Sequence, residues 1–288
     1  MSEQHNYVAV RLRDALPALP PAEQRVARTF LAAADDLDHL TITECAHRAA
    51  TSTATVVRLF QRLGYPRYKG FVVDLAIDLR RHDTPDVSGD IAPNDDLADV
   101  IAKVHADEVM SMADTVHTLD QVALQRAVEL VAGASRIDLF GAGGSGVGVH
   151  DLQQKLSRIG RTALLWSDRH SAWTAAATLP STAVALAVSH SGATADTVEF
   201  LRIARESGAP TLAVTNHGGS ALCEHADVVL RTAAREAPFR SGALGSRMAQ
   251  LLVLDILFIA VAQSSYEISM ANLHRTVDVV GRPTGHTR

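Results

Sequence analysis

Cysteine is scarce in this sequence, and its spacing argues against folds held together by disulfides or by a cysteine-bound zinc ion. The two cysteines, Cys45 and Cys223, lie far apart and show no CxxC spacing. Neither a disulfide framework nor a cysteine zinc site is therefore expected. Asp168 and His170 suggest a metal pair, but no third ligand is evident, so we expect no metal and no cofactor. The cysteine usage fits a reducing, cytoplasmic location.

Long apolar runs and export features are also lacking. The longest apolar stretch, residues 248–262, contains Asp255. It is shorter than the ~20 residues that cross a bilayer, so we expect a buried helix and no membrane partner. The first residues carry charges and lack a small-residue cleavage site, which argues against a signal peptide.

Acidic residues are missing from one segment of an otherwise acidic chain. The net charge is −5, but residues 1–82 carry 11 Lys and Arg against 9 Asp and Glu, which leaves −7 for the rest. Residues 45–73 contain five basic residues and no acid. A local basic patch of this kind attracts the phosphate backbone of nucleic acid.

The composition changes between two periodic regions, which indicates two domains. Around residues 82–96, Pro, Gly, Ser, Asp and Asn replace the apolar periodicity of both flanks. We predict a DNA-binding domain over residues 1–82, a linker over 83–96 and a ligand-binding domain over 97–288. The first domain should be entirely helical, because apolar spacing predicts helices over residues 22–34, 41–50, 53–64 and 68–80.

The second domain should be a doubly wound parallel sheet, so that the expected fold class is α followed by α/β. After a helical stretch at residues 97–119, short apolar runs alternate with helix-like segments, which predicts a parallel sheet with ligands at the carboxyl ends of its strands. The expected strands lie at residues 136–140, 163–166, 183–189, 211–216 and 227–231.

Two short predicted helices in the first domain have the form of a helix-turn-helix. Thr41 followed by Glu44 is a capping-box pattern, and Ser52 or Thr53 is placed to cap a second helix from about Ala54 to Leu63. A tight polar turn between two such helices is typical of a helix-turn-helix, although unrelated helical hairpins share the pattern.

The second of these helices is the candidate for contact with DNA. Val56, Leu59 and Leu63 should face the core, which would place other side chains outward in the major groove. The groove candidates are Thr53, Thr55, Arg58 and Arg62, and the candidates for phosphate contact are Arg67 and Lys69. The alternative is that Arg58 and Arg62 form an ordinary solvated face.

Two loops after predicted strands are candidates for binding an anion. The first contains Gly141, Gly143, Gly144 and Gly146, with Ser145 at the start of a helix, and exposes backbone N–H groups at a positive helix end. The second brings Ser189, Ser191, Gly192 and Thr194 to the end of another strand, just before a helix that should begin near Ala193. A monophosphate has the size and charge for this cradle.

A dinucleotide offers a competing interpretation of the first loop. Gly141, Gly143 and Gly146 satisfy GxGxxG, and Asp168 follows about where a ribose-binding acid is needed. Two points argue against this interpretation. It leaves the second phosphate-binding loop without a ligand, and the sequence shows no set of catalytic residues for hydride transfer.

The order of these motifs resembles the RpiR-type family of bacterial sugar-responsive regulators, which join a helix-turn-helix domain to a sugar isomerase (SIS) domain. The resemblance covers nearly the whole chain. It rests on TVVRLFQRLGYPRYKGF in the first domain. In the second it rests on GAGGSG, SDRH, SHSGATADTVEF, GAPTLAVTNHGGSAL, ADVVL and SRMAQLLVLDILF.

The resemblance implies an effector site in the second domain. It places the phosphate on Ser189, Ser191 and Thr194, and brings Ser145 to the sugar or its phosphate. Gly144 and Gly192 belong to the same two loops. The match at SDRH implies that His170 contacts sugar hydroxyls, with Asp168 as the second candidate. The late segment, with Glu236 as the first candidate and Arg240, Ser246 and Arg247 beside it, would close the site. For Ser145, Ser191 and His170 the alternative is an ordinary helix cap.

The function implied is a transcription regulator whose affinity for operator DNA changes when a phosphorylated sugar binds. Helix-turn-helix proteins commonly pair to match two half-sites, so a homodimer or tetramer is expected. The alternative is a phosphosugar isomerase or lyase, for which Glu236 or His170 would be nominated as the base. We favour binding without turnover, with no catalytic residue, because an isomerase has no need of an attached arginine-bearing helix pair.

Overall fold

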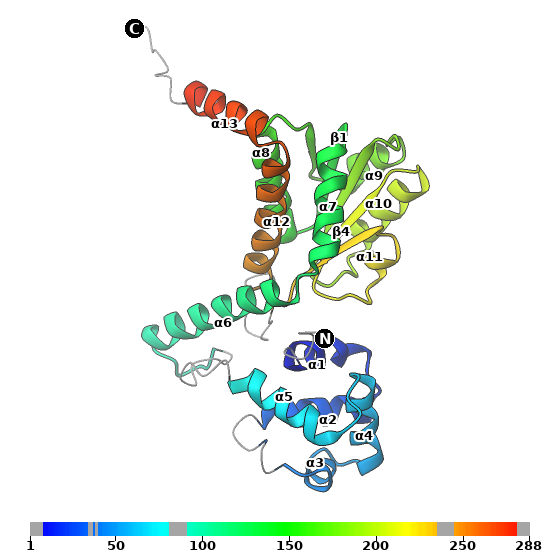
Figure 1. Cartoon of the computed structure of the whole chain (residues 1–288), viewed down its shortest axis with the longest axis vertical. Helices are drawn as coiled ribbons and strands as arrows, with labels where there is room; N and C mark the ends of the chain where they lie inside the picture. The colour runs from blue at the N-terminus through cyan, green and yellow to red at the C-terminus, as the bar shows by residue number, and fades with distance from the viewer. Residues whose placement is uncertain (1–7, 34–36, 38–39, 81–90, 235–244, 281–288) are drawn as a thin grey trace. The chain divides into compact units, whose positions relative to one another are not determined.

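Two compact units make up the chain in the computed structural model, which describes residues 8–33, 37, 40–80, 91–234 and 245–280. The units comprise residues 1–106 and 107–288. The expected class, an all-helical part followed by an α/β part with a parallel sheet, is confirmed (Figure 1). The predicted linker at residues 83–96 falls largely outside the described residues, and its bounds stay a prediction.

The first unit is a cluster of short helices around an aromatic core. Phe30 and Phe71 meet edge to face with ring centroids 4.9 Å apart, and both are fully buried. The helix at residues 8–15 was not among those predicted from the sequence, and its Val8 and Leu12 are buried in the same core. The elements are α1 (Val8–Ala15), a 3-10 turn η1 (Leu16–Ala18), α2 (Pro21–Ala32), α3 (Ile42–Arg48), α4 (Thr53–Arg62) and α5 (Tyr68–Arg80).

The second unit contains a five-stranded parallel sheet in the order β2-β1-β3-β4-β5, and its strands lie at the five predicted positions. The strands are β1 (Arg136–Gly141), β2 (Ala163–Trp166), β3 (Ala183–Val188), β4 (Thr211–Thr215) and β5 (Val228–Arg231). The order reverses beside β1, where β2 and β3 flank it on opposite sides. Such a switch point is where open α/β sheets bind ligands.

Helices cover both faces of this sheet (Figure 1). One face packs large side chains such as Ile137 and Leu139 against α7 (Gln121–Gly133), α8 (Ser145–Arg158) and α12 (Gly245–Ser264). The other face meets α9 (Arg169–Ala176), α10 (Ala195–Glu206) and α11 (Ala221–Glu224). This second face is built largely of alanine, including Ala185, Ala187 and Ala213 on the strands and Ala172, Ala176 and Ala204 on the helices.

Two further long helices complete the described chain. They are α6 (Leu97–Thr118), at the predicted position, and α13 (Tyr266–Val280). Among the described helices, one segment, Ser246–Ser264 in α12, is long and apolar enough to cross a membrane by length and composition. Its buried residues Val253, Leu254 and Leu257 lie in the core of the second unit, while Ile259 is 61% exposed, so the expected buried helix is buried along one face only.

Candidate functional site

The helix pair α3–α4 begins both of its helices with side-chain caps. The Thr41 hydroxyl accepts a hydrogen bond from the Glu44 backbone N–H at 3.1 Å, as the capping-box pattern predicts. Of the two candidates for the second cap, it is Ser52 that accepts from the Thr55 N–H, at 3.3 Å. The two caps fix where α3 and α4 start and therefore which faces they present.

The turn between these helices carries local strain and is held from outside. Ala50 has φ of 47°, in the left-handed region that a residue with a Cβ adopts at a cost. Arg25 on α2 donates from Nε to the Ala49 carbonyl at 3.0 Å and from Nη2 to the Ala50 carbonyl at 3.2 Å. A guanidinium fork on two successive carbonyls fixes the turn against α2.

The face of α4 matches the prediction with one exception. Val56, Leu59 and Leu63 are buried as expected. Thr53, Arg58, Arg62, Arg67 and Lys69 are all exposed. The prediction that Thr55 faces outward is wrong: it is 3% exposed, because it lies one turn before the core residue Leu59 and its hydroxyl faces Ser52 at 3.0 Å.

Two of the basic side chains are engaged within the unit. Arg62 donates from Nε to Glu23 Oε2 at 3.1 Å, and the Glu23 side chain is 5% exposed while that of Arg62 is 55% exposed. Arg58 donates to the Thr55 hydroxyl at 3.2 Å. The charge of Arg62 is therefore shared with a buried carboxylate on α2, which the count of acids between residues 45 and 73 did not reveal.

The glycine-rich loop leads from β1 directly into α8. Gly141 and Gly146 approach other backbone atoms so closely that a Cβ would lie 3.0 Å from a carbonyl oxygen, and Gly143 has φ of 57°. Gly144 stands at the N-cap of α8 without a side-chain cap. Ser145 is 8% exposed, and its hydroxyl accepts a hydrogen bond from Gln250 Nε2 of α12 at 3.2 Å.

The serine-rich loop between β3 and α10 gathers three hydroxyls. Ser189 is 3% exposed; its hydroxyl accepts from the Gly192 N–H at 3.2 Å and lies 3.1 Å from the Thr194 hydroxyl. The exposed Ser191 accepts from the Ala193 N–H at 3.2 Å. Thr194 is the N-cap of α10, which begins at Ala195, two residues later than expected, and its side chain makes no capping bond. These hydroxyls therefore do not have the ordinary capping role.

Gly192 gives this loop its tight path. Its φ is 61°, and it is buried against the next loop of the sheet. A Cβ at this position would overlap Ser220 Oγ and Cβ and lie 2.9 Å from Thr215 Oγ1. The backbone of the loop thus approaches β4 and the start of α11 more closely than any other residue type permits.

The loop between β2 and α9 carries the SDRH segment. Asp168 caps α9 by accepting from the Ser171 N–H at 3.0 Å, and this hydrogen bond is the main reason that its pKa is lowered. His170, in the first turn, is exposed. Trp173 Nε1 donates to the Asp196 carbonyl at 3.0 Å, and Arg169 lies 3.9 Å from the Asp196 carboxylate. The segment is therefore tied to the first turn of α10, beside the serine-rich loop.

The late segment falls partly outside the described residues. Glu236 and Arg240 lie there, so their place is left as a prediction. Ser246 is buried and Arg247 partly exposed near the start of α12. Burial raises the pKa of Glu108 on α6, and the positive charge of Arg247 lowers it in part.

Several polar residues near the loops were not predicted. Gln250 is 2% exposed and belongs to the SRMAQLLVLDILF segment. Nothing in the local sequence indicated that it would bind Ser145. His190 and His217 follow β3 and β4, and their rings meet at 71° with centroids 5.6 Å apart. Within the part of the chain that the structure describes, no group of three His, Cys, Asp or Glu residues is arranged to hold a metal ion.

Comparison with known proteins gives two family matches. Residues 7–82 match the helix-turn-helix domain of the rpiR family, and residues 130–260 match the SIS domain. An uncharacterised HTH-type transcriptional regulator of Caldanaerobacter subterraneus is 34% identical, over 93% of this chain and 95% of that protein. One from Bacillus subtilis is 33% identical, over 90% of this chain and 91% of its own length.

Solved structures share the fold. The Vibrio vulnificus NanR protein complexed with ManNAc-6P has a TM-score of 0.61 and 30% identity, over 95% of this chain and 98% of NanR. The sugar isomerase domain of an RpiR transcription factor from Sphaerobacter thermophilus has a TM-score of 0.58 and 26% identity, over 62% of this chain and 98% of that domain.

Proposed function

The chain belongs to the rpiR family of helix-turn-helix proteins that carry a SIS domain, and from this premise we propose that a phosphorylated sugar, bound in the SIS domain, changes its affinity for operator DNA. The relatives that match it over nearly their whole length are named transcriptional regulators. The NanR structure, similar over 95% of this chain, was solved with a phosphosugar.

The observation that carries the effector site is the serine-rich loop. Three hydroxyls gather at the carboxyl end of β3, yet α10 begins without a side-chain cap. The free N–H groups and positive dipole of a helix start favour an anion, and a phosphate has several oxygens to accept from hydroxyls and amides together. In this proposal the phosphate binds Ser189, Ser191, Thr194 and the backbone at Gly192.

The remaining effector contacts extend from this anchor. Ser145 and the backbone at Gly144 would meet the sugar or its phosphate from the glycine-rich loop, with Gln250 orienting the Ser145 hydroxyl. His170 would contact sugar hydroxyls from the start of α9. Glu236 keeps its proposed role as a polar contact from the late segment.

The DNA side of the proposal rests on the exposed face of α4. Thr53 and Arg58 are the candidates for base contact, and Arg67 and Lys69 for phosphate contact. Arg62 would add to the positive potential while it stays paired with Glu23. Effector binding shifts DNA affinity only through a differential preference for one conformation, a coupling typically worth ~1–3 kcal/mol. The proposal includes a homodimer or tetramer, a cytoplasmic location, and binding without chemical turnover.

The effector site is tested by thermal unfolding with a panel of sugar phosphates that includes ManNAc-6P. A ligand at ~100-fold its dissociation constant adds ~2.7 kcal/mol to the stability of the native state, which gives a clear rise in melting temperature. The Ser189→Ala, Ser191→Ala double variant should lose this rise. Ser135→Ala is the matched control: it deletes hydrogen bonds to Thr182 at the amino ends of β1 and β3, and should keep the rise.

The regulatory step needs a second measurement. Duplexes selected from a random pool by the full chain should bind with lower or higher affinity when the stabilising sugar phosphate is added. Incubation of the same sugar phosphate with the protein, followed by NMR, tests the isomerase alternative. A new sugar product would refute binding without turnover, and loss of DNA binding in Arg58→Ala would support the α4 face.

A further inference from the structure

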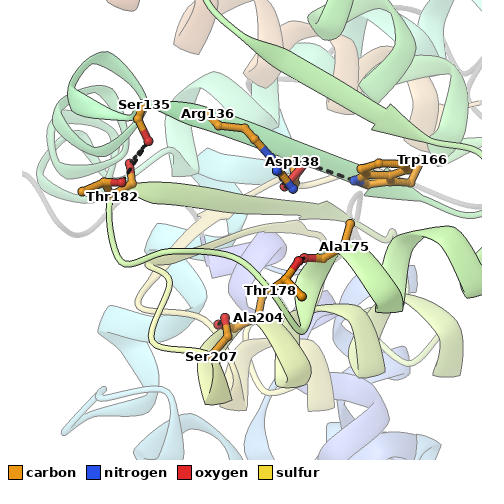
Figure 2. A network of polar contacts seen from close by, with 9 residues as sticks. All are labelled: Ser135, Arg136, Asp138, Trp166, Ala175, Thr178, Thr182, Ala204 and Ser207. Carbon is orange, nitrogen blue, oxygen red and sulfur yellow. Dashed lines mark hydrogen bonds and ion pairs between the residues drawn. The ribbon is translucent and has the colours of Figure 1, made fainter.

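A buried carboxylate lies in the middle of the sheet, away from the loops described above. Asp138 on β1 is fully buried, and Figure 2 shows its oxygens between Arg136 and Trp166. Arg136 donates from Nε at 2.9 Å and from Nη2 at 2.7 Å to Oδ2. Trp166 donates from Nε1 to Oδ1 at 3.1 Å. This network joins β1 to the edge strand β2.

Stability alone is a weak reason for such a network. Asp138 is fully buried while the Arg136 side chain is 31% exposed, and removing a carboxylate from water costs about as much as its attraction to a partner returns. The neighbouring positions on the same face of β1 and β3, such as Phe140, Ala185 and Ala187, are apolar. The charged group is therefore better explained by what it orients.

What the carboxylate orients is the end of β2. Trp166 is the last residue of this four-residue edge strand, and its backbone lies opposite Phe140 of β1. Its indole reaches back along the sheet to Asp138, which lies opposite Leu164. The residues after Trp166 are Ser167 to His170, so the hydrogen bond fixes the point from which this segment leaves the sheet.

The segment is fixed from its other side as well. Trp173 of α9 donates to the Asp196 carbonyl in the first turn of α10, and Arg169 lies over the Trp173 ring at 5.8 Å. The segment from Ser167 to His170, which includes the first turn of α9, therefore runs between one anchor on β1 and another on α10. Both anchors are indole N–H donors, which allow one direction of approach only.

We infer that Asp138 is a positioning residue: through Trp166 it sets the place of the β2–α9 loop, and so the preference for the sugar part of the effector over bare phosphate. The inference rests on the proposed function, in which His170 contacts the sugar and the serine-rich loop holds the phosphate. Asp138 itself touches neither.

The direct test is Trp166→Phe, which removes the N–H donor and keeps an aromatic ring, while Asp138 keeps Arg136. Hydrogen exchange of the ligand-free full chain should become about 3- to 10-fold faster in residues 167–171, as expected for the loss of one hydrogen bond. Residues 189–197 should exchange unchanged. Ser135→Ala, which deletes hydrogen bonds at the amino ends of β1 and β3, should change neither segment.

Binding supplies the second readout. Calorimetry with ManNAc-6P and with inorganic phosphate gives a ratio of dissociation constants for each variant. In Trp166→Phe, and in Asp138→Leu, which removes both acceptor oxygens, ManNAc-6P should bind about 3- to 10-fold more weakly while inorganic phosphate binds as before. A merely structural role would weaken both ligands together and leave the ratio unchanged.

The two measurements distinguish failure of the positioning role from failure of the proposed effector site. Equal exchange in residues 167–171 of the variant and the unsubstituted chain, or an unchanged binding ratio, would overturn the positioning role. Failure of both ManNAc-6P and inorganic phosphate to bind the unsubstituted chain would instead count against the proposed effector site, and the exchange readout would still decide whether Asp138 holds the loop.

Discussion

Replacing Gly192 with alanine should be among the most costly single-methyl changes in the second unit. The residue has φ of 61°, a conformation that costs a side chain about 1–2 kcal/mol. The added Cβ would also overlap Ser220 and crowd Thr215, and overpacking typically costs about 1–3 kcal/mol. Together these give a loss of about 2–5 kcal/mol in the free energy of unfolding.

The two contributions separate through a control and a rescue. Gly208→Ala is the control for the backbone strain alone, because Gly208 has φ of 87° and a Cβ there has nothing within 4 Å. Its free energy of unfolding should fall by only about 1–2 kcal/mol. Ser220→Gly removes the overlapping atoms. It should cost less than about 1 kcal/mol, because Ser220 is an N-cap without a capping bond where glycine is tolerated, and its hydroxyl loses only a weak contact with Cys223 Sγ at 3.4 Å.

The assay is urea unfolding followed by tryptophan fluorescence. The chain has two tryptophans, Trp166 and Trp173, and both lie in the second unit, so the signal reports that unit. The Gly192→Ala, Ser220→Gly double variant should recover most of the overpacking cost but stay less stable than Gly208→Ala, because Thr215 Oγ1 still lies 2.9 Å from the added Cβ. If Gly192→Ala costs no more than Gly208→Ala, or if Ser220→Gly restores nothing, the close approach of the two loops is wrong.

Three further predictions concern the first unit. Ala50→Gly should stabilise it by about 1 kcal/mol in calorimetry, because glycine relieves the left-handed backbone at φ 47°. Arg62→Ala should destabilise it by about 1–2 kcal/mol, since the buried Glu23 carboxylate loses its partner, and Glu23→Gln in the same chain should recover part of the loss. Burial raises the pKa of Cys45 from 9.0 to about 12, so at pH 8 about one thiol in 10,000 is ionised. In a Cys223→Ala chain, iodoacetamide should therefore react only after unfolding. The protonated thiol contributes its whole share to the free energy of unfolding below pH 9, and this share is lost as the pH rises from 9 to 12.

The sheet could be predicted from the sequence because each strand is a short apolar run bounded by turn residues. The runs at 136–140 and 183–189 became β1 and β3, and the glycine and serine loops followed them as expected. The helix α1 was missed because its two turns offer little periodicity. Its contribution comes from Val8 and Leu12 packing into a core assembled from residues far along the chain.

The sequence predicted the positions of helices and strands better than it predicted which side chains contact each other. Thr55 could have been placed correctly, because it precedes the core residue Leu59 by four positions and shares its face. Gln250 could not, since its partner Ser145 is 105 residues away. The same holds for Asp138 and Trp166, which only the register of β1 with β2 brings together. Pairings of this kind depend on tertiary geometry, which local pattern does not encode.

The alanine face of the sheet has a consequence for how this protein can change over evolutionary time. Ala185, Ala187 and Ala213 let α10 rest close on β3 and β4, and α9 packs against α10 in the same layer, so that a larger side chain there would displace packed neighbours. The exposed positions of the loops before these helices, such as Ser191 and His170, stand outside the layer, and substitutions there leave its packing untouched, whereas Gly192 is held by its close contacts. New effector preferences are thus open to the loops one residue at a time, while the alanine layer admits change only by concerted replacement.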